Sequence, residues 1–245
     1  GAIDPDKNRR SLFEKKYKGK VFSNIKDDWQ ETEPEIIVVA SPTNTHLEII
    51  KKIVKCKSLK VILCEKPLSF KFQDSLEIVE LCKKANIYLF VNYVRRADPA
   101  ALLIKQKIQS KVIKEPIKGF CWYTKGMIHT ASHFVDLLTF WLGEIKNYKQ
   151  ICENQIRSGE DSEPDFLIEF EKGIVIFQAG WEECFSHYSI ELLSSTGRLR
   201  YDQGGSNVTW QGLIDDPEFE GYTILDHKSV TINDEMNKYQ LNITQ

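Results

Sequence analysis

The sequence predicts an α/β domain with a parallel sheet of Rossmann type, followed by an α+β domain with a large, mostly antiparallel open sheet. Between residues 35 and 91, short apolar segments alternate with amphipathic helical segments. After residue 98, most strand-like segments instead alternate apolar and polar residues. The length of 245 residues suits two modest domains, which we place at residues 1–97 and 98–245.

Three apolar segments predict the strands of the first domain. Residues 35–40, Val61–Cys64 and Ile87–Val91 lack polar alternation, which indicates strands buried on both faces. Helical spacing of apolar residues predicts a helix from Thr45, as its N-cap, to Lys55, and another from Phe72 to Ala85. Strand–helix–strand order with short links favours parallel strands joined by right-handed crossovers.

The second domain is predicted to be rich in half-exposed strands. We expect helices over Ala100–Gln109 and about Ile128–Leu142, the latter ended by Gly143. The expected strands are Phe120–Tyr123, then Asp165–Phe170 and Ile174–Ala179 as a hairpin, then His187–Leu193 and Arg198–Tyr201.

Large apolar side chains near the open face of this sheet predict that it is covered. Phe177, Trp181 and Tyr188 are the residues we expect there. Because exposed apolar patches of this kind usually form interfaces, we expect a homodimer or homotetramer through the sheet.

Composition excludes several classes of partner. The net charge is −2, from 33 basic and 35 acidic residues, so neither nucleic acid nor an anionic membrane is an expected partner. No apolar run reaches the roughly 18–20 residues of a membrane span. The six cysteines form no CxxC pair; Cys64, Cys82 and Cys121 lie in apolar surroundings, as expected of core residues in a cytoplasmic protein.

Polar side chains follow each of the three apolar strands. The loops are residues 40–46 (Ala-Ser-Pro-Thr-Asn-Thr-His), 65–67 (Glu-Lys-Pro) and 92–96 (Asn-Tyr-Val-Arg-Arg). Doubly wound sheets bind ligands beyond the carboxyl ends of their strands, so three such loops predict a binding site. Each loop alone would suit an ordinary strand-to-helix connection.

Lys66 is the first candidate for proton transfer. It follows a predicted buried strand, and Pro67 restricts the backbone of both residues. An ammonium group at the mouth of a low-dielectric cleft can exchange a proton with a substrate hydroxyl. The alternative is a surface lysine after a strand.

A second constellation lies on the predicted helix of the second domain. His129, His133 and Asp136 are spaced i, i+4 and i+7, so they share one face. Paired histidines can bind a metal, but no Glu follows His129 as in HExxH and no third ligand is evident, so we expect none. An imidazole suits removal of a proton from an alcohol, which makes His133 an acid/base candidate; the alternative is a core histidine.

Together, four segments resemble the Gfo/Idh/MocA oxidoreductases, the family of glucose–fructose oxidoreductase and inositol dehydrogenase. They are residues 37–46, Glu65–Pro67, residues 92–96 with Asp98 and Pro99, and Ser132–Leu138 with Trp141–Gly143. The resemblance implies that Lys66 and His133 are catalytic. His129 stands where many members carry Asp or Asn, which implies a catalytic or substrate-positioning role. The residues implied to contact the cofactor are Asp4, Ala40, Ser41, Pro42, Asn44, His46, Glu65, Lys66, Asn92 and Arg96.

Asp4 matches the acidic residue that ends the family's second strand. Its carboxylate would accept hydrogen bonds from the adenosine ribose and repel a 2′-phosphate, so we expect NAD, with NADP less favoured; a simple turn residue is the alternative. The family's first strand and GxGxxG turn, which holds the pyrophosphate, have no counterpart in these 245 residues. If the protein lacks that segment, we expect little cofactor binding.

The function implied by the resemblance is hydride transfer between a nicotinamide cofactor and a hydroxyl-bearing carbon of a sugar, cyclitol or sugar derivative. One alternative is a non-catalytic dinucleotide- or sugar-binding regulator with the same fold, but this predicts loss of Lys66 or His133, and both are present. Another is a binding or assembly protein that acts through its open sheet.

Overall fold

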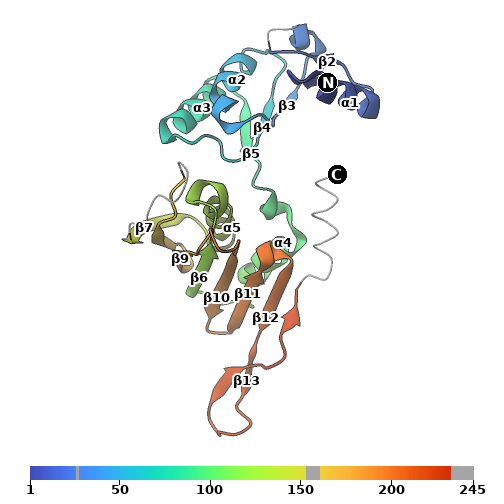
Figure 1. Cartoon of the computed structure of the whole chain (residues 1–245). Helices are drawn as coiled ribbons and strands as arrows, with labels where there is room; N and C mark the ends of the chain where they lie inside the picture. Colours follow the sequence, from blue (N-terminus) through green and yellow to red (C-terminus); the bar gives the residue numbers. More distant parts are fainter. Residues whose placement is uncertain (26–27, 153–160, 233–245) are drawn as a thin grey trace. The chain divides into compact units, whose positions relative to one another are not determined.

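The order of helices and strands follows the predicted fold class through the described residues, which are 1–25, 28–152 and 161–232 of a computed structural model (Figure 1). The chain divides into two units, Gly1–Asn92 and Tyr93–Gln245. Each unit has its own hydrophobic core.

Parallel strands form two sheets in the first unit. The smaller sheet pairs β1 (Ala2–Ile3) with β2 (Val21–Phe22), and the larger has the order β3 (Ile36–Val39), β4 (Val61–Cys64), β5 (Tyr88–Val91). The helices are α1 (Lys7–Tyr17), α2 (His46–Ile53) and α3 (Phe72–Lys84), with short 3-10 turns η1 (Asp28–Thr32) and η2 (Thr43–Thr45).

One face of the β3–β4–β5 sheet is covered by α2 and α3. Ile50 of α2 and Ile78 of α3 are fully buried with Ile62 and Cys64 of β4. On the other face Ile36, Val38, Tyr88 and Phe90 are 56–71% exposed. The prediction of strands buried on both faces is therefore wrong within the described residues, where helices pack on one face only.

Two features at helix starts differ from the sequence-based expectation. Helix α1 was not predicted, because none of its residues is buried and it has no apolar stripe; Asp6 caps it by accepting from the N–H groups of Asn8 and Arg9. Thr45 stands at the N-cap position of α2, as predicted, but its side chain makes no capping hydrogen bond. Its hydroxyl instead donates to the Pro42 carbonyl (2.7 Å) and bonds to the Ser41 hydroxyl (2.8 Å).

An eight-stranded sheet forms the body of the second unit. Its order is β15-β12-β11-β10-β6-β9-β8-β7, and of the neighbouring pairs only β6 and β9 run parallel. The strands are β6 (Ile117–Tyr123), β7 (Ile145–Cys152), β8 (Asp165–Phe170), β9 (Gly173–Ala179), β10 (Ser189–Ser194), β11 (Gly197–Asp202), β12 (Asn207–Gln211) and β15 (Val230–Thr231). The remaining elements are η3 (Val94–Ala97), α4 (Pro99–Gln109), η4 (Met127–Ala131), α5 (Ser132–Leu142), η5 (Gln203–Gly205), β13 (Leu213–Asp215) and β14 (Thr223–Leu225).

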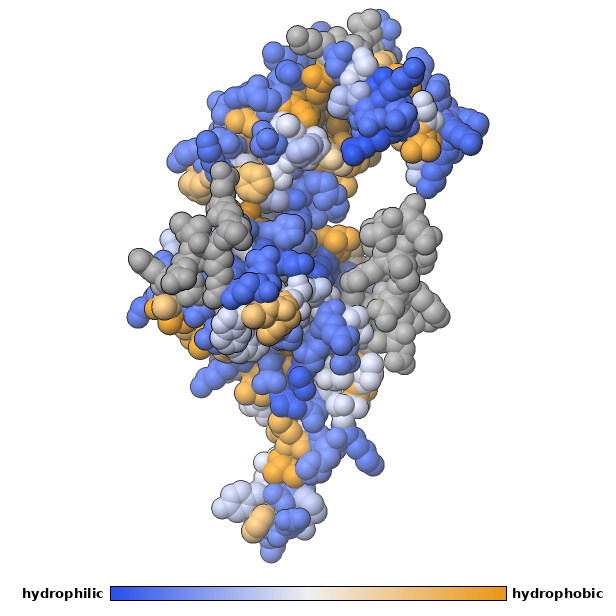
Figure 2. Space-filling view, viewed as in Figure 1, coloured by the Kyte–Doolittle hydropathy of each residue, from blue (hydrophilic) through white to orange (hydrophobic). Residues whose placement is uncertain are grey.

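Helices α4 and α5 pack on one face of this sheet (Figure 1). Trp141 of α5 is buried against Tyr201 of β11, and its indole N–H donates to the Ala101 carbonyl of α4 at 2.9 Å. The β13–β14 hairpin projects from the sheet, and along it Figure 2 shows apolar residues exposed beside hydrophilic ones.

Two of the three residues expected near the open face of the sheet, Phe177 and Tyr188, lie on its helix-covered side instead. Phe177 is fully buried on the helix side, where it stacks on Phe166 at 4.5 Å, and Tyr188 packs against Phe134. Only Trp181 of the three expected residues is exposed. The open face carries Phe120, Trp122, Ile174 and Ile176, because successive side chains of a strand point to opposite faces.

The predicted helix Ile128–Leu142 is two pieces. Residues Met127–Ala131 form a π-helical turn, η4, and α5 begins at Ser132. Gly126 opens the turn at a φ of +83°, and its carbonyl accepts from the N–H of Ala131, five residues on, at 3.2 Å. Turns of this kind often occur at functional sites.

Candidate functional site

The carboxyl ends of β3, β4 and β5 meet at one edge of their sheet. Val39, Cys64 and Val91 are register partners, so the residues that follow them come together. The Asn92 amide donates to the Glu65 carboxylate at 2.8 Å, and the Glu65 N–H donates to the Val39 carbonyl at 2.8 Å. The three loops predicted from the sequence are thus adjacent.

Exposure differs among the residues at this edge. Ala40, Pro42 and Asn44 are exposed, which leaves them accessible to a ligand. The half-buried residues are Ser41, Glu65, Lys66 and Asn92. Lys66 directly follows Glu65, and its peptide bond to Pro67 is cis.

His46 differs from the other residues of this group. Its side chain is 0% exposed, with Nε2 2.9 Å from the Ser41 carbonyl oxygen and Nδ1 3.1 Å from that of Leu68. The Cys64 Sγ lies 3.3 Å from the same Nδ1. Burial raises the pKa of the Cys64 thiol to about 12, so this thiol is neutral at physiological pH.

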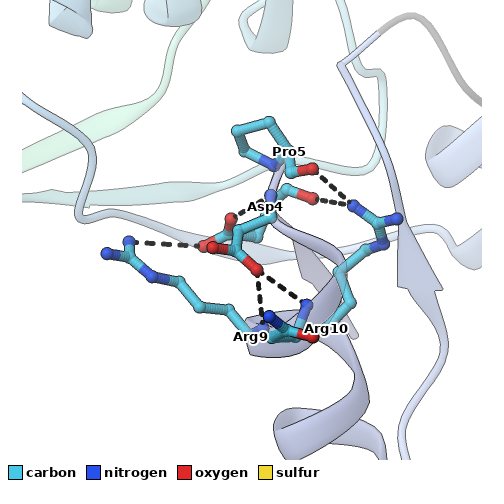
Figure 3. Close-up of polar contacts among 6 residues, drawn as sticks. Asp4, Pro5, Arg9 and Arg10 are labelled. Carbon is cyan, nitrogen blue, oxygen red and sulfur yellow. Dashed lines mark hydrogen bonds and ion pairs between the residues drawn. The ribbon is translucent and has the colours of Figure 1, made fainter.

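Asp4 lies directly after β1, at the start of the turn into α1 (Figure 3). One carboxylate oxygen accepts from the Asp6 N–H at 2.8 Å, and the other is 3.9 Å from the Arg9 guanidinium. Arg10 donates to the carbonyls of Asp4 (2.6 Å) and Pro5 (2.9 Å), which holds the turn. Backbone hydrogen bonds from Arg9 and Asn8 lower the pKa of the Asp6 carboxyl, so the cap stays ionised.

The second unit holds the remaining predicted residues on η4 and α5. His129 is exposed and His133 is half-buried. The ring of Tyr93 meets the His133 ring edge-on, with centroids 5.7 Å apart. Burial raises the pKa of the Tyr93 hydroxyl, which keeps it protonated beside the imidazole.

Arg96 forms a bidentate salt bridge with Asp136 of α5. Its Nε and Nη2 donate to the two carboxylate oxygens at 2.7 and 2.6 Å. Burial raises the pKa of the Asp136 carboxyl, and the Arg96 hydrogen bonds and charge oppose that rise. The pair therefore fixes the segment before α4 against α5, the helix that carries His133.

Two acidic residues that the sequence did not single out hold the start of that helix. The Asp161 carboxylate accepts from the N–H groups of Ile128 (2.8 Å) and His129 (2.7 Å). Glu163, 2% exposed, accepts from the Gly126 N–H at 3.0 Å. No local motif signals these contacts, because more than 30 residues separate the partners.

The predicted residues thus fall into two groups, each within one unit. The first comprises the strand-end residues of β3–β5, with Asp4 after β1; the second comprises Arg96, His129 and His133. Among residues 1–25, 28–152 and 161–232, no group of three or more His, Cys, Asp or Glu side chains could hold a metal. No helix in these ranges is long and apolar enough to span a membrane.

Known proteins resemble this chain over different lengths. Residues 1–93 match the model of the oxidoreductase family with an NAD-binding Rossmann fold, GFO_IDH_MocA. Myo-inositol 2-dehydrogenase from Thermotoga maritima is 31% identical over 107 residues, which cover 44% of this chain and 31% of that protein. The 2,7-anhydro-N-acetylneuraminate hydratase of Escherichia coli is 26% identical over 195 residues, or 69% of this chain and 51% of that protein.

Solved structures share the fold over most of the chain. An NAD binding oxidoreductase from Klebsiella pneumoniae superposes with a TM-score of 0.75 at 18% identity, covering 98% of this chain and 72% of that one. Levoglucosan dehydrogenase in complex with NADH and levoglucosan gives 0.71 at 16% identity, covering 94% and 70%. These likenesses confirm the predicted fold class.

Proposed function

Because the chain belongs, through residues 1–93, to the Gfo/Idh/MocA oxidoreductases with an NAD-binding Rossmann fold, we propose that it is a nicotinamide-dependent dehydrogenase. Its substrate would be a hydroxyl-bearing carbon of a sugar, cyclitol or sugar derivative. One observation carries the proposal: the ends of β3, β4 and β5 meet, with Glu65 bonded to Asn92 and Lys66 beside them. Ligands bind at this edge of doubly wound sheets.

The residue types suit two parts of a dinucleotide. Asp4 offers a carboxylate oxygen to the ribose of the adenosine half. Ser41 and Asn44 offer polar side chains to the nicotinamide half, beside the exposed Ala40 and Pro42. When bound, the nicotinamide ring would accept the hydride of the substrate carbon. No glycine-rich turn for the pyrophosphate occurs in these 245 residues. The cofactor experiments below therefore use the intact gene product.

Preference for NAD over NADP would depend on Asp4 and Arg9. The carboxylate disfavours a 2′-phosphate, whereas the exposed Arg9 guanidinium 3.9 Å away favours one. We expect Asp4→Asn to improve NADPH affinity relative to NADH by about fivefold, since one repulsion at contact distance in water costs ~1 kcal/mol. Lys15→Ala, on the last turn of α1, is the charge-matched control for Arg9→Ala, which should weaken NADPH alone.

Proton transfer would fall to Lys66 and His133. Lys66 would exchange a proton with the substrate hydroxyl, and His133 would serve as acid/base, held against Tyr93 and on a helix locked by Arg96 and Asp136. His129, exposed on η4, would position the substrate. Arg96 would act by holding α5 in place, because its Nε and Nη2 both donate to Asp136.

We also propose that a second copy covers the open sheet face of the second unit. Phe120 and Trp122 lie there with ring centroids 5.0 Å apart, beside Ile174 and Ile176, which are 42% and 36% exposed. Ile176→Lys should convert the oligomer to a monomer in light scattering, whereas Lys83→Ala, an exposed residue of α3 in the first unit, should leave it intact. An unaltered mass for Ile176→Lys would contradict this interface.

The decisive experiment titrates the intact gene product with NADH and NADPH and then screens sugars and cyclitols. Product analysis should accompany absorbance at the nicotinamide band, because the relative with the widest overlap among those above is named a hydratase, and a reaction without net redox change would leave that absorbance flat. Binding of neither cofactor would refute the dehydrogenase. Cofactor binding without turnover of any substrate would favour the regulator.

Variants then test the assigned roles. Lys66→Ala and His133→Ala should each abolish turnover with little change in cofactor affinity, and removal of a proton-transfer group costs roughly 10²–10⁴-fold. The exposed Lys60→Ala and His227→Ala are matched controls and should retain activity. Full activity in both test variants would contradict these roles.

A further inference from the structure

Arg95 lies on η3, between two residues that contact α5. Tyr93 meets the ring of His133, and Arg96 is paired with Asp136. The Arg95 side chain is half-buried and makes contacts of its own with α5, with β11 and with the η5 turn. These contacts lie within the second unit, which carries His133.

Two aromatic rings contact the Arg95 guanidinium. Its Cζ lies 5.4 Å from the centroid of the Phe134 ring and 5.8 Å from that of the Tyr188 ring. A cation within about 6 Å of a ring centroid is attracted to the face of that ring. Phe134 is fully buried and directly follows His133 on α5. The contact therefore holds the helix at the residue next to the candidate acid/base.

The Nη1 group of Arg95 is bonded to the turn between β11 and β12. It donates to the Gly204 carbonyl and, at 3.4 Å, to the Tyr201 hydroxyl. The Tyr201 hydroxyl in turn donates to the same carbonyl at 2.9 Å. Nη1 carries two N–H groups, the hydroxyl both donates and accepts, and a carbonyl oxygen has two lone pairs. All three bonds can therefore form at once.

The backbone of this turn is one that needs support. Gln203 has a φ of +51°, in the left-handed region that residues other than glycine rarely adopt, and Gly204 has a φ of +66°. Such conformations persist where the surrounding structure holds them. A Cβ at Gly204 would lie 2.5 Å from Cε2 of Tyr188 and 3.2 Å from Nη1 of Arg95. Arg95 thus packs directly on the turn that it bonds to.

We propose that Arg95 is a positioning residue that joins α5 to the η5 turn and thereby holds His133 in place beside Tyr93. Where it concerns proton transfer by His133, this inference rests on the proposed function. Arginine suits the role because its planar guanidinium stacks on aromatic rings while its N–H groups donate hydrogen bonds at the edge.

Two substitutions separate the parts of this contact. Arg95→Met keeps the length of the side chain and its apolar packing, but it removes the charge and every donor. Arg95→Lys keeps a charge and three donors, but it loses the planar group that lies on the rings. We therefore expect Arg95→Lys to retain part of what Arg95→Met loses.

The NMR signals of the His133 imidazole are the first readout, measured on the intact gene product with isotope-labelled histidine. They are assigned by their loss in His133→Gln. The Tyr93 ring, with its centroid 5.7 Å away, shifts these signals through its ring current. Arg95→Met should move them toward their positions in the urea-unfolded protein, and Arg95→Lys should move them less. Because this readout needs neither cofactor nor turnover, it stands apart from the success or failure of the proposed function.

Kinetics are the second readout. Arg95→Met should lower kcat about tenfold, because a displaced proton-transfer group slows the chemical step. The KM for NAD should change less than about twofold, because the expected cofactor contacts at the strand ends lie in the first unit. Arg95→Lys should give a kcat between those of Arg95→Met and the unaltered protein. An arginine that only adds stability would lower Tm without this loss of kcat.

Lys105→Met is the matched control. Lys105 is also a half-buried cation over a ring of α5, that of Phe140, whose centroid is 3.7 Å from Nζ. Phe140 lies further along the helix than His133, so this control should leave the His133 signals and kcat unaltered. An equal shift of the signals in Lys105→Met and Arg95→Met would overturn the proposal.

Gly204→Ala tests the same contact from the turn, and it serves if Arg95→Met does not fold. The added methyl group would press on Arg95 and Tyr188, so it should shift the His133 signals in the same direction. Unmoved signals in the folded Arg95→Met or Gly204→Ala protein would overturn the proposal. Shifted signals with an unchanged kcat would overturn its catalytic part.

Discussion

Replacement of Asp161 by asparagine tests how the start of the His133 helix is held. The carboxylate accepts from the N–H groups of Ile128 at 2.8 Å and His129 at 2.7 Å, one on each oxygen. Asparagine keeps the shape but offers a single accepting oxygen. Its NH₂ group would face one of the two backbone N–H donors, so one bond is lost and a repulsive contact appears.

The size of the effect follows from these contacts. A hydrogen bond to a charged acceptor contributes about 1.5–3 kcal/mol, and a helix cap about 0.5–2 kcal/mol. Because Asp161 is only half-buried, we expect the free energy of unfolding to fall by about 1–2 kcal/mol. In a protein of this size each kcal/mol lowers Tm by roughly 2–4 °C, so a fall of about 2–8 °C is expected.

Thermal and urea unfolding followed by near-ultraviolet circular dichroism measure this change. Asp216→Asn is the matched control, because its carboxylate also accepts from two backbone N–H groups, those of Glu218 and Phe219, but on the exposed β13–β14 turn. We expect that control to change stability by less than about 0.5 kcal/mol. A Tm of Asp161→Asn within about 1 °C of the unaltered protein would refute the reasoning.

Three further outcomes are expected. Burial raises the pKa of the Asp98 carboxyl above its unfolded value of 3.8, so its contribution to stability is complete below that pH and is lost as pH rises through the folded-state pKa. Asp98→Asn should therefore flatten the plot of unfolding free energy, measured in urea, against pH over this range. An unchanged slope would be evidence against this assignment. Gly126→Ala should lower the free energy of unfolding by more than about 1 kcal/mol, because φ is +83° and a Cβ would overlap the Asp161 carboxylate. A Tm equal to that of the unaltered protein would contradict this. Of the six cysteines only Cys152 and Cys184 are exposed. A thiol reagent should therefore react quickly with two thiols in the native protein and with all six after unfolding. Three or more fast-reacting thiols in the native protein would disprove the burial pattern.

The sequence alone was sufficient for much of the first unit. Unbroken apolar segments predicted β3, β4 and β5, and polar residues after each strand predicted the edge where Glu65 and Asn92 now meet. Local pattern was enough there because a parallel strand and the loop that follows it are contiguous in the chain. Helix α1 was not predicted because none of its side chains is buried, and its sequence therefore shows no apolar stripe.

Contacts between segments far apart in the chain could not be predicted from local sequence pattern. Nothing in the residues around Asp161 or Glu163 indicates that they hold Gly126 and His129, because each bond spans more than 30 residues. The sides of the sheet were also assigned wrongly for Phe177 and Tyr188, since a strand pattern shows alternation but not which face the helices cover.

His46 shows where the division lies. Its position after a strand and at the start of a helix follows from local pattern, and the sequence by itself determined that a histidine stands among the loops of the candidate site. Only the tertiary structure decided that the ring is buried between the carbonyls of Ser41 and Leu68. Burial and hydrogen-bond partners depend on how β3, β4 and α2 pack, and that packing is a property of segments far apart in the chain.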